Sequence, residues 1–323
     1  MRETDIHRRD LILALAAAIV GSAPRAAELG KSGTIKLVVP FAPAGATDII
    51  ARAIAPRLGE KLGAQIVVIN AAGASGTIGA ASVANAEPDG NTLLLYHIAM
   101  VTTHHFQKGM PFDPLNSFTP IGLVAQASNV VTVNPALPAR NLRELVDYAK
   151  ANPGKVNFGS SGVGSSDHLG GELLQSVTRT QLTHVPYKGG GPAIAGLVGG
   201  ETEVNAGSIA QVVAMVKAGR LRALAVMQSS RSATLPDIPT TGEAGFPALD
   251  HRTWLGVWGP AKMTPDVVNR INGALRDVLA MDDVRQAFEK VGVDPAVSSP
   301  QEFDSYIRTQ HGLWNKVFAG KAP

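Results

Sequence analysis

The stretch KLVVPFAPAGATDIIARA (residues 36–53) predicts a strand, a glycine-containing loop and a helix in direct succession. The apolar run before Pro40 is typical of a strand that is buried on both faces of a parallel sheet. Gly45 can adopt backbone angles closed to other residues, and Thr47 or Asp48 can cap the helix that follows. Such a loop directs free backbone N–H groups and the positive end of a helix at one point, which suits a carboxylate or a phosphate.

The same stretch admits two other interpretations. It could be only a tight strand-to-helix connection of the kind common in α/β domains. A nucleotide-binding loop fits less well, because the Walker motif G-x-x-x-x-G-K-[ST] needs a lysine and a second glycine that are absent here. The sequence therefore favours an anion that is bound without a dedicated lysine.

The composition is that of a globular protein with room for two hydrophobic cores. The chain has 323 residues, of which 45% are hydrophobic and 17% charged. Its 29 basic and 26 acidic residues give no electrostatic footprint for nucleic acid. Because the chain has no cysteine, we expect no disulfide, no thiolate metal site and no lipid-modified cysteine anchor.

Residues 1–27 have the pattern of a signal peptide. Arg2, Arg8 and Arg9 precede an apolar run at 11–20, and small residues follow that run. The run is shorter than the roughly 20 residues that span a bilayer, and a buried first helix is the alternative. Export by the general route or by the twin-arginine route remains open. Either route predicts a soluble periplasmic protein with no direct membrane insertion.

After the opening unit, the chain continues as alternating strands and helices. Residues 65–69 predict a second strand, AAGASGTIGAA (71–81) a second glycine loop, residues 77–86 a helix and residues 92–96 a third strand. The loop glycines are spaced G-x-x-G-x-x-G, which is not the dinucleotide pattern G-x-G-x-x-G. This order is typical of a parallel α/β sheet, which binds ligands at the C-terminal ends of its strands.

Three histidines follow the third strand and raise the question of a metal site. His97, His104 and His105 lie in a segment without a helical H-x-x-x-H motif and without cysteine. We therefore expect no metal there. His97 differs from the others because it stands at the strand end, where a parallel sheet has its binding edge.

Two long extended stretches divide the chain into two sets of units. Residues 121–133 are long for one strand and have a polar centre at 126–129, and residues 250–259 form the second stretch. We expect both to cross between two lobes. Alternating units lie between them, from a helix at 141–151 to a strand at 221–226. Three helices, at 264–280, 282–291 and 300–318, close the chain.

A second informative loop opens GSSGVGSSDHLGGELL (residues 159–174), where glycines and serines precede a helix. Backbone donors, hydroxyls and a helix N-terminus converge there. The competing interpretation is a catalytic Ser165 or Ser166 activated by His168. Because the nucleophile elbow G-x-S-x-G is absent, we favour serines that donate hydrogen bonds. Lys188, before three glycines, could neutralise an anion or could only stand on a solvated turn.

Five stretches, in order along nearly the whole chain after residue 27, form a recognisable pattern. They are VVPFAPAGATD (38–48), NAAGASGTIGA (70–80), FGSSGVGSSDH (158–168), HVPYKGGGPA (184–193) and RLRALAVMQSSRSATLPDIPTTGEAG (220–245). Through these motifs the chain resembles the Bug family of extracytoplasmic solute receptors, which serve tripartite tricarboxylate transporters. Each motif alone is weak, and the five together are specific.

The resemblance implies the fold class. We expect an α/β, two-lobed periplasmic binding protein fold, in which each lobe is a parallel-type sheet flanked by helices and two crossing strands form the hinge. Lobe 1 would comprise residues 30–125 plus 251–323, and lobe 2 residues 126–250. A carboxylated ligand would be enclosed between the lobes.

The resemblance also implies which positions bind the ligand. In this family the first loop holds a ligand carboxylate, partly through ordered water. The matching positions of lobe 1, with His97 added from the strand end, are Phe41, Ala44, Gly45, Ala46, Thr47, Asp48, Asn70, Gly73, Ala74 and His97. Those of lobe 2 are Ser160, Ser161, Gly164, Ser165, Ser166, His168 and Ser208. No catalytic residue, metal or cofactor is expected.

Two departures from the usual family pattern bear on the ligand. Tyr96 and His97 stand where small residues are common, and Gly207 stands where many members have an acidic residue before the serine. Because Gly207 offers nothing to an ammonium group, we expect no preference for amino acids. An aromatic carboxylate or a di-acid without an amine fits better, with His97 near its far end. The alternative is that Tyr96 and His97 only pack.

The favoured function is a receptor that delivers its ligand to membrane transporter subunits in a transient contact, as a monomer. A sensor for a membrane signalling partner is one alternative. A secreted serine-type hydrolase that uses Ser165 or Ser166 with His168 is the other. The sequence favours binding over catalysis, because glycine loops before helices are plentiful while no activated nucleophile is recognisable.

Overall fold

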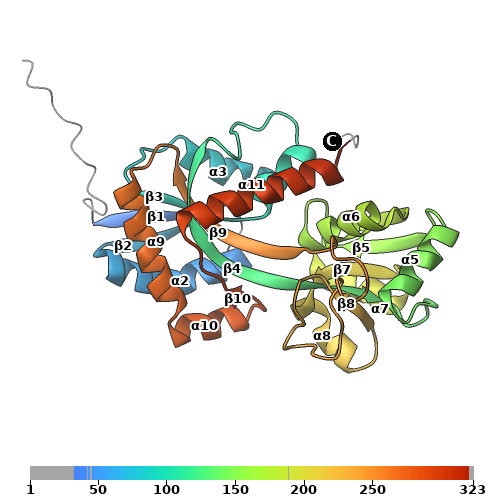
Figure 1. Ribbon diagram of the computed structural model, residues 1–323. Coiled ribbons are helices and arrows are strands. Elements are labelled where there is room, and N and C mark those ends of the chain that lie inside the picture. Colours follow the sequence, from blue (N-terminus) through green and yellow to red (C-terminus); the bar gives the residue numbers. More distant parts are fainter. Residues whose placement is uncertain (1–32, 42, 44–45, 188, 320–323) are drawn as a thin grey trace, which may run out of the picture.

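The computed structural model describes residues 33–41, 43, 46–187 and 189–319. Two groups of parallel strands lie on opposite sides of a central pair of long strands, and helices cover both faces (Figure 1). The half built on β1, β2 and β3 is called lobe 1, and the half built on β5, β6, β7 and β8 is called lobe 2. The predicted signal peptide lies outside the described residues.

The strands are β1 Thr34–Val39, β2 Gln65–Asn70, β3 Thr92–His97, β4 Phe118–Val133, β5 Val156–Ser160, β6 Leu182–Pro186, β7 Val204–Ser208, β8 Arg222–Val226, β9 Arg252–Pro260 and β10 Asp294–Pro295. The α-helices are α2 Ala46–Leu62, α3 Thr77–Ala84, α4 Ala99–Thr102, α5 Leu142–Ala151, α6 Ser166–Thr178, α7 Gly190–Gly199, α8 Ile209–Lys217, α9 Pro265–Leu279, α10 Asp282–Glu289 and α11 Pro300–Val317. Two short 3-10 helices, η1 Ala74–Gly76 and η2 Thr103–His105, complete the list.

The sheet pairing confirms the predicted fold class. In lobe 1, β1 pairs in parallel with β2 and β3. In lobe 2, β5 pairs in parallel with β6 and β7. The central strands β4 and β9 run antiparallel to each other, and the strand order is β2-β1-β3-β9-β4-β7-β5-β6. Two α/β lobes thus share one sheet whose centre is the pair of crossing strands.

The strand β4 is continuous over 16 residues and changes its partners in the middle. Up to Ser128 it pairs with β9, and from Asn129 it pairs with β7 and β8. The change falls within the polar centre at 126–129 that the sequence indicated. Among the described strands, no pairing other than those of β4 and β9 ties one lobe to the other along the sheet at this point. A hinge between lobes is expected at such a place.

Three groups of buried side chains hold these layers together. One lies under α2, α9 and α10 and includes Ile35, Leu37 and Ile50. A second runs under α3, α11, α5 and α6 and spans both lobes, with Trp254 and Phe158 among its members. A smaller third group lies under α7 and α8. The core below α11 therefore continues from lobe 1 into lobe 2.

The predicted cap of the first helix is wrong in one respect. Because α2 begins at Ala46, Thr47 and Asp48 lie inside its first turn rather than at the capping position. Asp48 still places a negative charge near the positive helix end, which is favourable. The residue before the helix, Gly45, lies outside the described residues.

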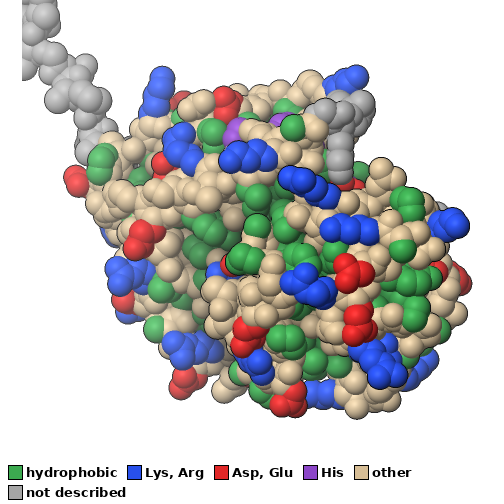
Figure 2. All heavy atoms as spheres, turned by 45° about the vertical axis from the view of Figure 1, so that its right-hand side comes forward, with side chains coloured by type: hydrophobic (Ala, Val, Ile, Leu, Met, Phe, Trp, Pro, Cys, Tyr) green, Lys and Arg blue, Asp and Glu red, His purple; other side chains and the backbone are tan. Residues whose placement is uncertain are grey.

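The surface carries charges of both signs. On the face drawn in Figure 2, Lys and Arg side chains alternate with Asp and Glu side chains over both lobes. This face therefore has no large field of one sign. Within the described residues, no helix combines the length and apolar character needed to cross a membrane.

Candidate functional site

The predicted site residues fall into two groups, one in each lobe. The lobe 1 group follows β1, β2 and β3, and the lobe 2 group follows β5 and β7. His97 pairs with Leu255 of β9, and Ser208 pairs with Asn129 of β4. Both groups therefore lie next to the central part of the crossing strands. Ala44, Gly45 and Lys188 lie outside the described residues.

In lobe 1, Asp48 is the centre of a hydrogen-bond network. Its carboxylate is buried and accepts from Arg52 Nε at 3.0 Å and from Asn70 Nδ2 at 2.9 Å. Asn70 Nδ2 also donates to the carbonyl oxygen of Phe41 at 3.1 Å, and Arg52 Nη2 donates to Asn70 Oδ1 at 3.0 Å. Asp48 and Asn70 thus fix the positions of residues 41 and 46–48 from within the protein.

The second glycine loop is shaped by its backbone angles and by Tyr96. Gly73, Ala74 and Gly76 all have positive φ angles, of 134°, 46° and 93°. A Cβ atom at Gly76 would lie 2.7 Å from Tyr96 Oη, so only glycine allows this ring to pack there. Tyr96 is fully buried, and burial raises its pKa to about 12. Tyr96 therefore packs in the core and does not line an open surface.

His97, unlike Tyr96, is only half-buried. It stacks on Phe41 with ring centroids 4.5 Å apart and an interplanar angle of 13°. Burial lowers its pKa to about 4, so the imidazole is neutral at pH 7. Its Nδ1 accepts a hydrogen bond from Ala99 N–H at 3.1 Å. The ring proton therefore sits on Nε2, which becomes a hydrogen-bond donor.

In lobe 2, the loop before α6 is folded around the carboxylate of Asp167. Ser161 N and Ser161 Oγ donate to Asp167 Oδ2 at 2.8 and 2.7 Å. Ser165 Oγ lies 2.5 Å from Asp167 Oδ1 and from Gly162 O, so its one proton serves either acceptor. His168 N donates to Asp167 Oδ1 at 3.2 Å. These predicted ligand donors thus already have an internal acceptor.

Ser160 and His168 are also held inside lobe 2. Ser160 is the last residue of β5, is fully buried, and its Oγ lies 2.6 Å from His184 Nε2. Burial lowers the pKa of His184, which favours the neutral ring at that contact. His168 Nδ1 accepts from Gly164 N at 3.1 Å. Gly164 needs its positive φ of 81° to present this N–H.

Ser166 connects the loop to the crossing strands. Its Oγ accepts from Asn129 Nδ2 of β4 at 2.8 Å and is hydrogen-bonded to Thr253 Oγ1 of β9. His251 Nε2 lies 2.9 Å from the carbonyl oxygen of Ser166. The start of α6 is thereby fixed to both hinge strands.

The geometry does not bring either predicted nucleophile to His168. Ser165 Oγ accepts from the backbone N–H of His168, not from its ring. Ser166 Oγ contacts Asn129, Thr253 and His251 instead, and His251 Nε2 is directed at a carbonyl oxygen, so it acts as a donor rather than as a base. A serine–histidine pair of the hydrolase type needs a hydrogen bond from the hydroxyl to an accepting ring nitrogen.

Aromatic contacts join the two lobes beside this loop. Phe106 of lobe 1 lies 5.3 Å from the ring of His168, and Phe318, just after α11, lies 6.4 Å from it. Trp314 of α11 meets His251 edge to face at 5.2 Å. The end of α11 lies over lobe 2 in Figure 1. These rings add a contact between lobes that the hinge strands do not provide.

A hollow between the lobes lies beside α8 and α10, which Figure 1 draws on the opposite side of β4 from α6 and α11. It has a volume of about 960 Å³ and is lined by Ser128, by the first turn of α8 and by the segment from α10 to β10. Gly292 packs closely against Ala210 in this hollow. A Cβ atom at position 292 would lie only 2.0 Å from the Ala210 Cβ. Among the predicted site residues, only Ser208 adjoins this hollow in sequence.

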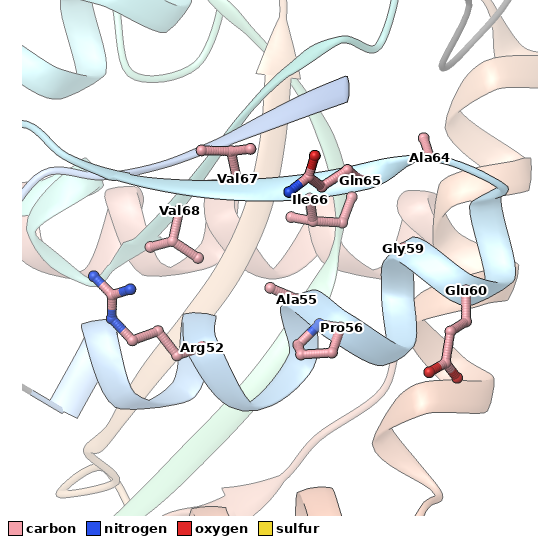
Figure 3. Close-up of a pocket in the computed structure, with 10 residues that line it drawn as sticks. All are labelled: Arg52, Ala55, Pro56, Gly59, Glu60, Ala64, Gln65, Ile66, Val67 and Val68. Atoms are coloured by element: carbon pink, nitrogen blue, oxygen red, sulfur yellow. The ribbon is translucent and has the colours of Figure 1, made fainter. Parts of the chain in front are cut away.

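A second hollow, of about 760 Å³, lies at the outer edge of lobe 1 between α2 and the edge strand β2 (Figure 3). Arg52 and Val68 stand at one end of it, and Glu60 stands near the other. Arg52 belongs to the Asp48 network, but none of the predicted site residues lines this hollow. It is therefore separate from the predicted site.

His104, His105 and His311 gather at the end of lobe 1. The rings of His104 and His105 lie 3.9 Å apart, and His311 lies 5.2 Å from His104. Within the part of the chain that the structure describes, no group of three or more His, Cys, Asp or Glu side chains is arranged to hold a metal ion. The structure places these histidines in an aromatic cluster with Phe318.

Several residues of this region were missed by sequence reasoning. Asn129 and Thr253 were expected only as hinge positions, and Phe106 was not singled out. Asp167 was not among the predicted ligand-binding residues. A usable signal for Asp167 was its position in the first turn of a helix behind four serines, where a carboxylate commonly accepts from loop donors.

His251 gives the fold a pH dependence that can be measured. It is buried, and burial lowers its pKa to about 4. In the unfolded chain the His251 ring is protonated below a pH of about 6.5, whereas in the folded chain it is protonated only below about pH 4. The free energy of unfolding therefore falls as the pH falls from about 6.5 to about 4. We expect this residue alone to remove about 2 kcal/mol from the free energy of unfolding between pH 7 and pH 5.

Urea unfolding at both pH values checks this, with His251→Gln as the comparison, because glutamine keeps an N–H donor for Ser166 O without a titrating ring. The variant is expected to lose less stability than the parent between pH 7 and pH 5. Equal losses in the two proteins would show that His251 does not carry the effect.

Comparison with known proteins places the chain in a family. Residues 50–320 match the family described as tripartite tricarboxylate transporter family receptor. BugT of Bordetella pertussis is 33% identical, over 92% of this chain and 91% of its own length. The solved structure of R. palustris Rpa4515 with adipate has a TM-score of 0.74 at 32% identity, covering 90% of this chain and 98% of that one. MatC from Rhodopseudomonas palustris with bound malate has a TM-score of 0.72 at 29% identity, covering 88% and 98%.

These matches confirm the resemblance drawn from the five motifs. They cover both lobes and the crossing strands, so the likeness concerns the whole fold and not one loop. The chain therefore belongs to the Bug-type receptors of the tripartite tricarboxylate transporter family.

Proposed function

We propose that this protein binds one small carboxylate between its two lobes and delivers it to the membrane subunits of a tripartite tricarboxylate-type transporter. The observation that carries the proposal is that the family match extends over both lobes and includes relatives whose structures hold adipate and malate. The protein acts as a binding receptor, and it works as a monomer in the periplasm after removal of residues 1–27. A sensor role, in which the closed receptor contacts a signalling partner, uses the same binding step.

The lobe boundaries and the binding positions are part of the same proposal. Lobe 1 comprises residues 30–125 plus 251–323, and lobe 2 comprises residues 126–250. The N-terminal end of α2 receives the ligand carboxylate through residues 41–48, of which the Asp48 network fixes residues 41 and 46–48. In support, Asn70 joins the end of β2 to Phe41 and to Asp48 at the helix start.

His97 is proposed as the contact for another part of the ligand. It is neutral, half-buried and directed by Ala99 so that Nε2 is a donor. Together with Phe41 it offers a flat ring surface at the strand end. This surface suits an aromatic carboxylate or a di-acid without an amine.

Titration calorimetry with a panel of aliphatic and aromatic carboxylates and of amino acids tests the function, and chromatography of the same mixtures tests for turnover. We expect saturable binding of one carboxylate per chain with the ligand recovered unchanged. Conversion of any bound ester or carboxylate into product would favour the hydrolase instead.

Ligand binding is expected to close the lobes by motion within residues 126–129 and 250–254. The physical reason is that β4 changes its pairing partners between Ser128 and Asn129, so the sheet passes from one lobe to the other at this point. Small-angle scattering should give a smaller radius of gyration at saturating ligand than in its absence. An unchanged radius under conditions where calorimetry shows full occupancy would argue against hinge closure.

A further inference from the structure

The loop that lobe 2 presents at the interface between the lobes already contains an anion of its own. Asp167 accepts from Ser161 N, Ser161 Oγ and His168 N, and it lies 2.5 Å from Ser165 Oγ. The side chain is 3% exposed. Ser161 N, Ser161 Oγ, Ser165 Oγ and His168 N are donors of the kind that bind an added anion at a helix N-terminus, and these four are thus in use.

The position of Asp167 depends on Gly207. A Cβ at residue 207 would lie 2.9 Å from the Asp167 Cβ and 2.8 Å from Asn205 Oδ1, closer than such contacts allow. Gly207 therefore leaves the space that Asp167 fills. From the sequence we expected no carboxylate near position 207, because Gly207 has no side chain. In the structure, the carboxylate of Asp167 on the neighbouring helix α6 lies next to this position.

The described part of the surroundings offers this charge no lysine or arginine partner. Glu172, five residues further along α6, is also buried, and its Oε1 lies 3.8 Å from His168 Nε2. The rings of His184 and His251, on β6 and just before β9, have lowered pKa values and are neutral at pH 7.

The loop faces the other lobe directly. A Cβ at Gly164 would lie 3.6 Å from Phe106 of lobe 1, and Ser166 contacts Thr253 on β9. Under the proposed function, a ligand enclosed between the lobes meets this loop with the end that points away from residues 41–48.

We propose that Asp167 is a specificity-determining residue that excludes a second carboxylate from the lobe 2 side of the site, so that the ligand is a monocarboxylate with a neutral far end. This inference rests on the proposed function and narrows it. A second ligand carboxylate would find the loop donors occupied and would be repelled by the fixed negative charge. An aromatic monocarboxylate has a single carboxylate and a neutral far end, so it needs no anion site in lobe 2.

Calorimetry with hexanoate and adipate tests the proposal, because the two acids have equal chain length and differ in the second carboxylate. Asp167→Asn keeps an acceptor for Ser161 or Ser165 and removes the charge. We expect this variant to shift the adipate-to-hexanoate affinity ratio at least tenfold toward adipate. The control is Asp147→Asn on the exposed face of α5, which removes one charge far from the loop and should leave the ratio within twofold.

Ser161→Ala provides a second variant that keeps the Asp167 charge but removes one of its donors, so it should move the ratio toward hexanoate. An unchanged ratio in Asp167→Asn, or a shift toward adipate in Ser161→Ala, would overturn the role of Asp167 while leaving carboxylate binding intact. Failure of the unmodified protein to bind any carboxylate would overturn the proposed function, and this inference with it.

Discussion

Gly45→Val is expected to lower the affinity for the carboxylate ligand at least a hundredfold while the protein stays folded. In the sequence Gly45 directly precedes Ala46, the first residue of α2. Under the proposed function, a bound anion approaches the first free N–H groups of this helix. A branched side chain at this position blocks that approach. Hydrogen bonds to a charged group contribute about 1.5–3 kcal/mol each, and loss of two of them accounts for the expected change.

Calorimetry with the tightest carboxylate of the panel measures this effect. The matched control is Gly273→Val in α9, an exposed glycine whose added Cβ would have no heavy atom within 4 Å. The control should bind as tightly as the unmodified protein. Normal affinity in Gly45→Val would mean that residues 41–48 do not anchor the ligand.

Gly170→Ala is expected to lower the free energy of unfolding by about 3 kcal/mol. Gly170 lies where α6 packs against β7, and an added Cβ would lie 2.1 Å from the carbonyl oxygen of Ala206. The atom that it meets belongs to the backbone of a central strand, so neither the helix nor the sheet can shift cheaply. The helix would be pushed away from the strand, and the loop around Asp167 would move with it.

Urea unfolding of Gly170→Ala and Gly273→Ala separates the effect of packing from that of helix propensity. Both changes add the same methyl group inside a helix, but the site in α9 is open. Gly273→Ala should gain about 0.5–1 kcal/mol, because alanine is the better helix former. If Gly170→Ala were as stable as the unmodified protein, α6 would not pack on β7 as closely as the structure shows.

The sequence was sufficient to predict the lobes, because their signals are local. Short apolar runs gave β1, which ends before Pro40, and also β2 and β3. The periodic leucines of α5 gave a helix whose Leu142, Leu145 and Val146 are buried. The long run at 121–133 indicated a crossing strand, and β4 extends it to Phe118. The second crossing strand begins at Arg252 rather than at 250, because His251 N still donates to Met227 O.

The candidate site was less predictable, because its details depend on contacts between distant residues. In a strand buried on both faces, alternation cannot tell that Tyr96 packs under Gly76 while its neighbour His97 stacks on Phe41. The sequence also cannot show that Gly207 makes room for Asp167, since 40 positions separate them and only the packing of α6 on β7 brings them together. For this reason the hydroxyls of Ser161 and Ser165, which the sequence pattern indicated as ligand donors, were found to donate to Asp167 instead.

Native mass spectrometry of the protein purified from its host, followed by identification of any small molecule released on unfolding, tests the central claim most directly. A receptor of this kind is expected to carry one small carboxylate per chain at a fixed stoichiometry, and a monocarboxylate if Asp167 acts as proposed. The released compound should rebind to the emptied protein, unchanged and at the same ratio. A bound amine or sugar without a carboxylate, or a compound that the protein converts on rebinding, would contradict the account.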